Sequence, residues 1–303
     1  MNILITGGTG FIGGALCREL KDSGHNIIIT TRRPSDSKEK LTWNPPELIP
    51  QKTMSKINAV INLAGESITA GRWTKERKER IMTSRVAATH ALAESIKNTD
   101  PRPEVLISAS AVGYYGPHGD ENVTETTPPG TDFLADVCKK WEAEALKAEA
   151  SGVRVVIVRF GTVLESDGGA LPKMARPFKF FAGGPIGSGK QWFPWVHRDD
   201  LIGFIQYALE NNTNTGPFNV TSPQPVTNKG FSSALGRALG RPSWLPVPGL
   251  VLKIAFGELG SVLTTGQRVI PERILKTGYQ FKYPDVDSAL RAIFGNKQKS
   301  RKT

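Results

Sequence analysis

The sequence has few cysteines and no long hydrophobic run, and both absences limit what the protein can be. Its two cysteines, Cys17 and Cys138, are too few for a metal cage, and both lie in segments with helical spacing, which indicates reduced thiols. No run approaches the roughly 18 apolar residues of a membrane span. The chain begins with a strand-like segment and leaves no room for a secretory signal. We therefore expect a cytoplasmic protein with no membrane partner.

Acidic residues are also scarce relative to basic ones. The chain has 39 lysines and arginines against 28 aspartates and glutamates, a net charge of +11. Such a surplus can indicate nucleic-acid binding, but neither an RNA-binding aromatic signature nor a helix-turn-helix pattern accompanies it. Four of the basic residues fall within 296–303, which we expect to be a disordered tail. We predict no nucleic-acid partner, because a basic surface equally suits an anionic cofactor and a phosphorylated substrate.

Glycines gather at the start of the chain, in MNILITGGTGFIG. The apolar segment 2–6 predicts a buried strand, and the apolar spacing after residue 11 predicts a helix that opens inside the glycine cluster. Strand, glycine turn and helix together are typical of dinucleotide binding. Gly7, Gly10 and Gly13 would allow positive φ and a close approach of the backbone to a pyrophosphate, with the helix N-terminus facing the phosphates.

The second predicted strand, residues 27–31, lacks the acidic residue that would bind the ribose of NAD. Arg32 and Arg33 follow the strand instead. Guanidinium groups pair bidentately with phosphate, so this end of the strand favours the 2′-phosphate of NADP. We therefore predict NADP(H) as the cofactor.

Strands and helices alternate along the first half of the chain. Strands are predicted at 57–63, 105–108 and 153–160, and helices at 74–98 and 132–150. This alternation predicts an α/β fold, a Rossmann-type doubly wound parallel sheet. We expect a Rossmann core at 1–164, to which 195–222 returns, and a smaller C-terminal lobe at 165–194 and 223–295.

Several motifs together resemble the extended and atypical short-chain dehydrogenase/reductases. They are TGGTGFIG, NLAG, SASAVGYYG, RFGTVL, GGPIGSGKQWFPWVHRDD and GPFNV, in that order. FLADVCKKWE and GQRVIPERILKTGYQFKYPD are similar more narrowly to a subfamily of predicted nucleoside-diphosphate-sugar epimerases. The resemblance runs from residue 1 to about 295 and implies a Rossmann core, NADP(H) and a C-terminal lobe of unassigned role.

Carried over by position, the resemblance implies a cofactor site. The pyrophosphate would lie on the glycine turn, the 2′-phosphate on the two arginines, and the adenosine on the residues after the strand at 57–63, with a residue of the long helix and a later threonine reaching the cofactor. These positions are Gly7, Gly10, Phe11, Ile12, Gly13, Arg32, Arg33, Leu63, Ala64, Gly65, Arg85 and Thr162.

The Tyr-x-x-x-Lys pair that enzymes of this superfamily usually use as general base is absent, because no tyrosine has a lysine four residues later. Two interpretations stay open. In one, Lys140 binds the nicotinamide ribose, Tyr115 or Tyr114 supplies the acid/base group, and Ser110 orients the substrate. In the other, the protein binds NADP(H) without catalysis, as a regulator.

His197 with Asp199 and Asp200 lacks metal-ligand spacing, so we predict no metal, and we expect one of these aspartates to cap a helix beginning at Leu201. The favoured function is oxidoreduction or epimerisation at a carbinol or carbonyl carbon of a small molecule such as a nucleotide sugar. The sequence does not define the oligomeric state.

Overall fold

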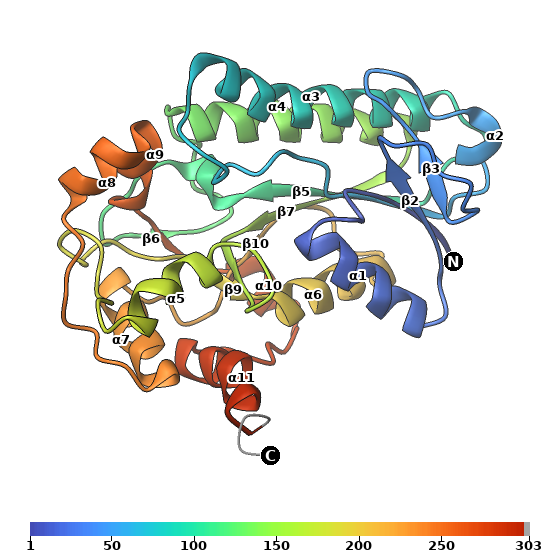
Figure 1. Cartoon of the computed structure of the whole chain (residues 1–303). Helices are drawn as coiled ribbons and strands as arrows, with labels where there is room; N and C mark the ends of the chain where they lie inside the picture. The colour runs from blue at the N-terminus through green and yellow to red at the C-terminus, as the bar shows by residue number, and fades with distance from the viewer. Residues whose placement is uncertain (300–303) are drawn as a thin grey trace.

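The computed structural model describes residues 1–299 and is built around a parallel sheet of seven strands (Figure 1). The strand order is β10-β7-β5-β4-β1-β2-β3, so the chain winds outward in both directions from β1. The strands are β1 (Asn2–Thr6), β2 (Asn26–Thr31), β3 (Lys40–Thr42), β4 (Ala59–Asn62), β5 (Val105–Ala111), β7 (Arg154–Phe160) and β10 (Gly216–Val220). Every neighbouring pair is parallel. The predicted doubly wound parallel sheet is therefore confirmed.

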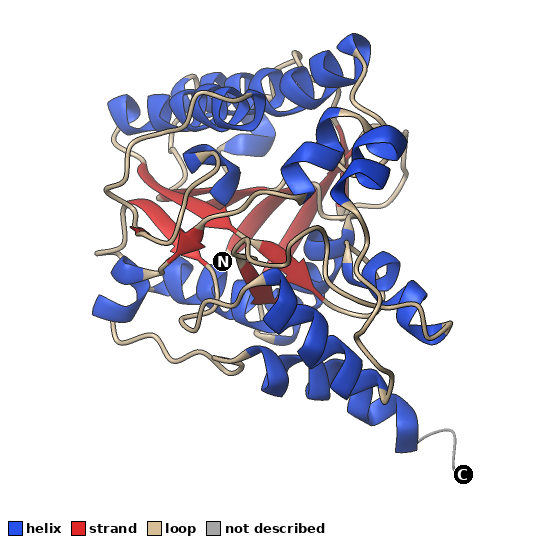
Figure 2. Cartoon of the chain, turned by 90° about the vertical axis from the view of Figure 1, so that its left-hand side faces the viewer, coloured by secondary structure: helices blue, strands red, loops and turns tan. Residues whose placement is uncertain are grey.

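Helices cover both faces of the sheet, as Figure 2 shows in a view turned by 90°. One face carries α1 (Phe11–Asp22) and α6 (Arg198–Glu210), and the other carries α2 (Gln51–Met54), α3 (Lys75–Lys97) and α4 (Phe133–Leu146). On the first face Leu16 and Phe204 pack with Ile5. On the second, Leu92 packs with Val60. The central strands are mostly apolar because both of their faces are buried, and most of their polar residues lie toward the carboxyl ends.

The two long helices begin where polar residues can cap them. Thr74 accepts a hydrogen bond from the backbone N–H of Arg77 at the start of α3, and Asp132 accepts one from Ala135 at 2.8 Å at the start of α4. Such caps satisfy N–H groups that have no partner inside the helix. The helices predicted at 74–98 and 132–150 are confirmed, the second ending in a 3₁₀ turn at Lys147–Ser151.

The C-terminal part of the chain forms a smaller layer of helices beside the carboxyl ends of the strands. These helices are α5 (Leu171–Lys179), α7 (Asn228–Leu239), α8 (Gly249–Phe256), α9 (Glu258–Leu263), α10 (Glu272–Lys276) and α11 (Val286–Lys299). Phe178, Phe231 and Leu290 join α5, α7 and α11 in a separate hydrophobic cluster. Two short parallel pairs complete the fold, β8 (Thr162–Leu164) with β9 (Trp195–His197), and β6 (Asn122–Val123) with β11 (Arg268–Val269).

The structure qualifies one expectation about the ends of this lobe. Of the segment 195–222, β10 and α6 return to the main sheet, whereas β9 pairs with β8 outside it. Helix α11 is described as far as Lys299, the disordered tail expected at 296–303 stays a prediction, and residues 300–303 lie outside the described residues. Among residues 1–299, no helix is both long and apolar enough to cross a membrane.

Candidate functional site

The carboxyl ends of four neighbouring strands bring most of the predicted site residues to one edge of the sheet. Gly7 follows β1 and Leu63 follows β4. Ser110 is the second-to-last residue of β5, and Thr162 begins β8 just after β7. In open parallel sheets, ligands bind at this edge, where the winding direction reverses.

The glycine turn packs backbone directly against backbone. Gly7 has a φ of 70°, and Gly10 donates a hydrogen bond to its carbonyl oxygen at 2.9 Å. A Cβ on Gly7 would lie 2.5 Å from the Leu63 oxygen, and a Cβ on Gly13 would lie 2.3 Å from the Gly7 oxygen, so neither position admits a side chain. This packing brings the first turn of α1 close to the ends of β1 and β4.

The start of α1 has the properties of an anion-binding site. Its N-cap, Gly10, is exposed and makes no side-chain capping bond, and the first turn contains no acidic residue. Unpaired N–H groups at a helix N-terminus bind phosphate. Phe11 turns toward the lobe, since a Cβ on Gly168 would lie 2.4 Å from its ring, and Ile12 packs on the core. The residues present therefore fit a dinucleotide.

Arg32 and Arg33 follow β2 and are both exposed. Neither guanidinium group makes an ion pair or a hydrogen bond to another side chain within residues 1–299; the only bond recorded there joins the Arg33 backbone N–H to Thr31. Two unengaged arginines at the end of the second strand are suited to hold a 2′-phosphate.

Polar side chains of β1, β4 and α3 hold the loop after β4 in place. Thr6 donates to the side chain of Asn62 at 2.7 Å and accepts from the backbone N–H of Ala64 at 3.2 Å. Arg85 donates to the carbonyl oxygens of Ile81 and Glu66, both at 3.0 Å, and its guanidinium lies under Gly65. Burial lowers the pKa of Arg85. The predicted contact of Arg85 with the cofactor stays a prediction; in this structure Arg85 supports the loop after β4.

A buried polar network joins the end of β7 to the inner side of α4. Arg159, at the end of β7, donates to both carboxylate oxygens of Glu142 on α4, at 2.8 and 2.7 Å. The two side chains are only 4% and 7% exposed. Burial alone would lower the pKa of Arg159, but the hydrogen bonds and charge of Glu142 outweigh it and raise that pKa. Ser110 donates to the same carboxylate at 2.6 Å.

Tyr115 closes the other side of this network. Its hydroxyl accepts a hydrogen bond from Arg159 at 3.0 Å and donates one to Asn219 on β10 at 2.6 Å. Burial raises the pKa of Tyr115 to about 12, so the group stays protonated at neutral pH. The structure therefore commits the hydroxyls of both Ser110 and Tyr115 to buried partners, which favours a structural role for each.

Tyr114 differs from its neighbour in exposure and in its contacts. It is half-buried, its ring lies 3.5 Å from the Cζ atom of Arg159, and it meets the ring of Tyr115 edge to face at 5.3 Å. Its hydroxyl makes no hydrogen bond to any described residue. Tyr114 is thus free to meet a ligand, with a cationic group against its ring.

Lys140 is not brought to this cluster. It lies on the exposed side of α4 and forms an ion pair with Asp136, 2.9 Å away, one helical turn earlier. The inward positions of the helix are Cys138 and Glu142, and Cys138 points at the carbonyl oxygen of Ala111. Thr162 is half-buried at the sheet edge, and its backbone N–H donates to Pro194.

The structure corrects the helix cap expected at Asp199 or Asp200. Helix α6 begins at Arg198, and His197 is its N-cap, accepting a hydrogen bond on Nδ1 from the backbone N–H of Asp199 at 3.0 Å. Burial lowers the pKa of His197, in keeping with a neutral acceptor. Asp200 instead accepts backbone bonds from Lys282 and Tyr283. No cluster of metal-ligating side chains occurs in the described part of the chain.

The family models match in two blocks. Residues 3–221 match the NAD dependent epimerase/dehydratase family, and residues 247–293 match a domain of unknown function, DUF1731. The chain belongs to this epimerase family. It is 40% identical to the epimerase family protein YfhF of Bacillus subtilis over 98% of this chain and 99% of that protein. It is also 40% identical to the mouse epimerase family protein SDR39U1, over 97% and 99% of the two chains.

Solved structures with the same fold superpose over nearly the whole chain. The human epimerase family protein SDR39U1 with NADPH has a TM-score of 0.91 at 38% identity and covers 98% of this chain and 100% of its own. The predicted cofactor, NADP(H), agrees with the NADPH of that relative. A UDP-glucuronic acid 4-epimerase from Bacillus cereus in complex with NAD has a TM-score of 0.76 at 18% identity, covering 99% of both chains, and shares the fold.

The residues that sequence reasoning missed are Glu142, Arg159 and Asn219, together with the role of His197 as a helix cap. Arg159 was a usable signal, because it and Arg154 are the charged residues of the otherwise apolar strand segment VRVVIVRF and a buried guanidinium requires an acidic partner. Its partner, Glu142, lay within the helix motif already singled out, two residues from the lysine that was chosen instead.

Proposed function

We propose that this member of the epimerase family binds NADP(H) and performs oxidoreduction or epimerisation at a carbinol or carbonyl carbon of a small substrate such as a nucleotide sugar. The observation that carries the proposal is the open glycine turn with two unengaged arginines at the same sheet edge as Tyr114. The NADPH of the human relative supports the cofactor. Structural neighbours crystallised with UDP-glucuronic acid or UDP-glucose support the substrate class.

In this proposal each part of the cofactor has its own residues. The N–H groups at the start of α1 hold the pyrophosphate, Arg32 and Arg33 hold the 2′-phosphate, and the loop from Leu63 to Gly65 lies against the adenosine. When bound, the nicotinamide supplies or accepts a hydride.

The proton of the reaction is assigned to Tyr114. A carbonyl carbon that receives a hydride needs a proton on its oxygen, and a hydroxyl group without a protein partner at the sheet edge can donate that proton and regain one from solvent; oxidation of a carbinol is the same step reversed. Tyr114 has such a hydroxyl, whereas those of Ser110 and Tyr115 are bonded inside the protein. Thr162, half-buried at the same edge, is the remaining predicted residue near the nicotinamide end. The catalytic roles predicted for Ser110, Tyr115 and Lys140 remain untested, and the contacts of these residues favour Tyr114.

Cofactor binding is tested by fluorescence titration with NADPH and NADH. Replacing Arg32 and Arg33 with alanine should weaken NADPH binding by roughly tenfold to a hundredfold, because a charge-assisted phosphate contact contributes about 1.5–3 kcal/mol. NADH affinity should stay unchanged, since NADH lacks the phosphate. Arg291→Ala, an exposed arginine on α11, serves as the charge-matched control. Equal losses of NADPH and NADH affinity would show that Arg32 and Arg33 do not bind the 2′-phosphate.

A second function, NADP(H) binding without catalysis, is favoured by one observation. Ser110 and Tyr115, two of the predicted catalytic hydroxyl groups, are bonded inside the protein, Ser110 to Glu142 and Tyr115 to Asn219. The two functions are separated by incubating the protein with NADPH deuterated at the transferable hydrogen and a panel of UDP-sugars and their keto forms. Transfer of deuterium to a substrate supports catalysis if Tyr114→Phe lowers its rate at least about tenfold and leaves NADPH affinity unchanged. Binding without transfer across the panel supports the regulator.

A further inference from the structure

A set of large apolar side chains stands exposed on one edge of the C-terminal lobe. In Figure 1 this edge is at the left, where α8 and α9 lie. Leu250 and Ile254 of α8 are 69% and 68% exposed, and Phe180, after α5, is 72% exposed. We call the following set the apolar face: Phe180, Phe181, Trp244, Leu245, Leu250, Val251, Ile254 and Phe256. Contiguous exposed apolar surface of this kind marks an interaction site.

Backbone hydrogen bonds join the two segments that carry the apolar face. Trp244 and Leu245 both donate to the carbonyl oxygen of Gly183 at 3.1 Å, and the indole N–H of Trp244 donates to the Phe181 oxygen at 3.0 Å. Val247 donates to Pro185 at 2.8 Å. The aromatic loop after α5 and the loop that leads into α8 therefore form one surface.

Phe181 is held in a conformation that costs energy. Its φ is 59°, in the left-handed region, and it is the one non-glycine residue there within residues 1–299. A bulky side chain disfavours this region, and such strain persists where the surroundings fix it. The strained backbone leaves the Phe181 ring half-exposed, so the strain does not serve packing of the core. A ring held at the surface in this way is consistent with contact to a ligand.

Helix α8 is packed on one side alone. Its sequence is GLVLKIAF, and it rests on α9, where a Cβ on Gly260 would lie 2.3 Å from the Leu252 oxygen. Leu250, Val251 and Ile254 are each more than half exposed, and Phe256 is 40% exposed. A helix this apolar is ordinarily buried. Something outside the described residues of this chain therefore has to cover it.

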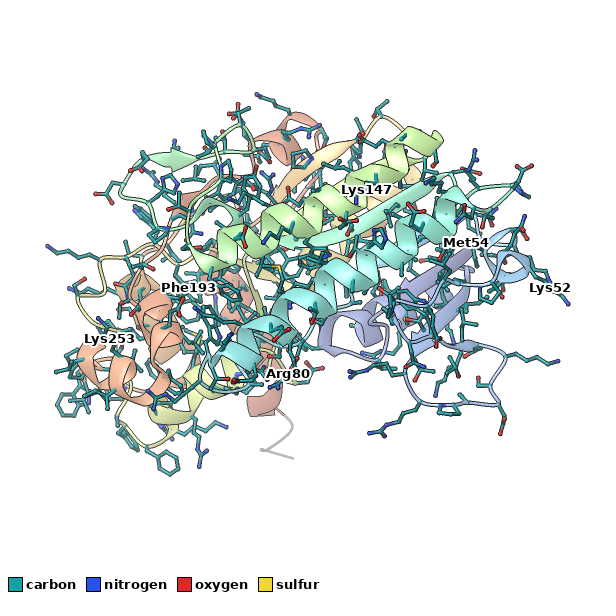
Figure 3. All side chains as sticks on the ribbon, turned by 90° about the horizontal axis from the view of Figure 1, so that it is seen from above. Lys52, Met54, Arg80, Lys147, Phe193 and Lys253 are labelled. Carbon is teal, nitrogen blue, oxygen red and sulfur yellow. The ribbon has the colours of Figure 1, made fainter. Side chains whose placement is uncertain are left out.

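The segments that carry the apolar face hold charge of one sign, and the nearby Glu258, at the start of α9, is paired with Lys78. The segments 171–189 and 241–257, which carry the face, contain five basic residues and no acidic one: Lys173, Arg176, Lys179, Arg241 and Lys253. Figure 3 shows Lys253 at the outer edge of α8, away from the body of the protein. Two copies placed face to face would bring like charges together, which disfavours a second copy as the occupant. A surface that covers this face has to offer apolar groups to the apolar side chains and negative charge to the basic ones.

We propose that this face binds the surface of a lipid bilayer that contains anionic lipids. Aromatic and aliphatic side chains on one face with lysine and arginine at the margin are the features of interfacial membrane binding. The apolar side chains enter the boundary of the acyl chains, and the basic groups meet the lipid phosphates. The expectation that the protein has no membrane partner rested on the absence of a spanning segment, which does not bear on attachment to one surface.

The test is co-sedimentation of the full-length protein with vesicles of phosphatidylcholine alone and of phosphatidylcholine mixed with phosphatidylglycerol. We expect binding to the anionic vesicles that weakens as salt is raised. Leu250→Ser with Ile254→Ser should lower that binding at least about tenfold, because each removes a large apolar anchor. Leu48→Ser, at a leucine 48% exposed near α2, is the matched control and should bind as the wild type does.

A charge-reversal pair tests the electrostatic half of the proposal. Lys179→Glu with Lys253→Glu should abolish the preference for anionic vesicles, whereas Lys52→Glu, on α2 at the opposite edge in Figure 3, should leave it intact. Absence of vesicle binding overturns the proposal. So does a dimer, measured by sedimentation equilibrium, that the Leu250 and Ile254 substitutions dissociate, since a second copy would then cover the face. Near-ultraviolet circular dichroism establishes that each variant is folded.

Discussion

Replacing Glu142 with glutamine tests how much the buried ion pair with Arg159 supports the fold. The substitution keeps the shape of the side chain and one acceptor oxygen but leaves the Arg159 charge, 4% exposed, without its counter-charge. Removing one partner of a buried pair costs about 3–5 kcal/mol, because the remaining charge stays out of water. We therefore expect a fall in melting temperature on the order of 10 °C.

The assay is urea unfolding followed by circular dichroism, with Glu272→Gln as the control. Glu272 pairs with Lys276 at the surface, where both side chains are more than 40% exposed, and its loss should cost less than about 1 kcal/mol. The double variant Glu142→Gln/Arg159→Met should be less destabilised than the sum of its single variants by about 1–3 kcal/mol. An unfolding midpoint for Glu142→Gln equal to that of the control would refute the reasoning.

Three further predictions follow from the described contacts. Gly13→Ala should abolish NADPH binding and destabilise the fold, because its Cβ would lie 2.3 Å from the Gly7 oxygen, whereas Gly14→Ala, whose Cβ would be 3.8 Å from its nearest neighbour, should bind normally and gain up to about 1 kcal/mol of stability. Burial raises the pKa of the Cys138 thiol to about 12, so a thiol reagent at pH 8 should label it slowly, if at all, before urea is added. Burial also raises the pKa of Glu125, so the folded protein holds this proton more tightly than the unfolded chain. Stability should therefore fall as pH rises from the ordinary glutamate pKa through the raised one, and Glu125→Gln should flatten that slope in pH-dependent unfolding.

The parts of the fold that depend on local patterns were predictable from the sequence. The glycine turn, the long helix at 74–98 and the alternation of strand and helix each follow from residues that lie near one another in the chain. Two arginines in place of an acid at the end of β2 indicated the cofactor for the same reason. These predictions depend on short-range rules of propensity, spacing and φ.

The parts of the site that depend on distant partners were not predictable. Tyr115 looked like an acid/base candidate until its partner Asn219, 104 residues away, was seen to hold its hydroxyl. Lys140 was chosen because lysine is the expected residue type, although the rotation of α4 turns Cys138 and Glu142 inward instead. Which side of a helix faces the core is set by packing, and a helix with charged residues on several sides leaves that choice open.

The order of the strands has a consequence for the synthesis of the protein on the ribosome. The outer edge of β7 is covered by β10, which is made only after the fifty or so residues that build α5, β9 and α6 have been added. Arg154, at the start of β7, donates to the carbonyl oxygens of Ala208 and Asn214. These hydrogen bonds also form only after the later segment has been synthesised. Until residue 220 has emerged, the nascent sheet carries an open, apolar edge of the kind that pairs with foreign strands. We expect nascent chains that end between β7 and β10 to be the ones that depend on chaperones and aggregate without them.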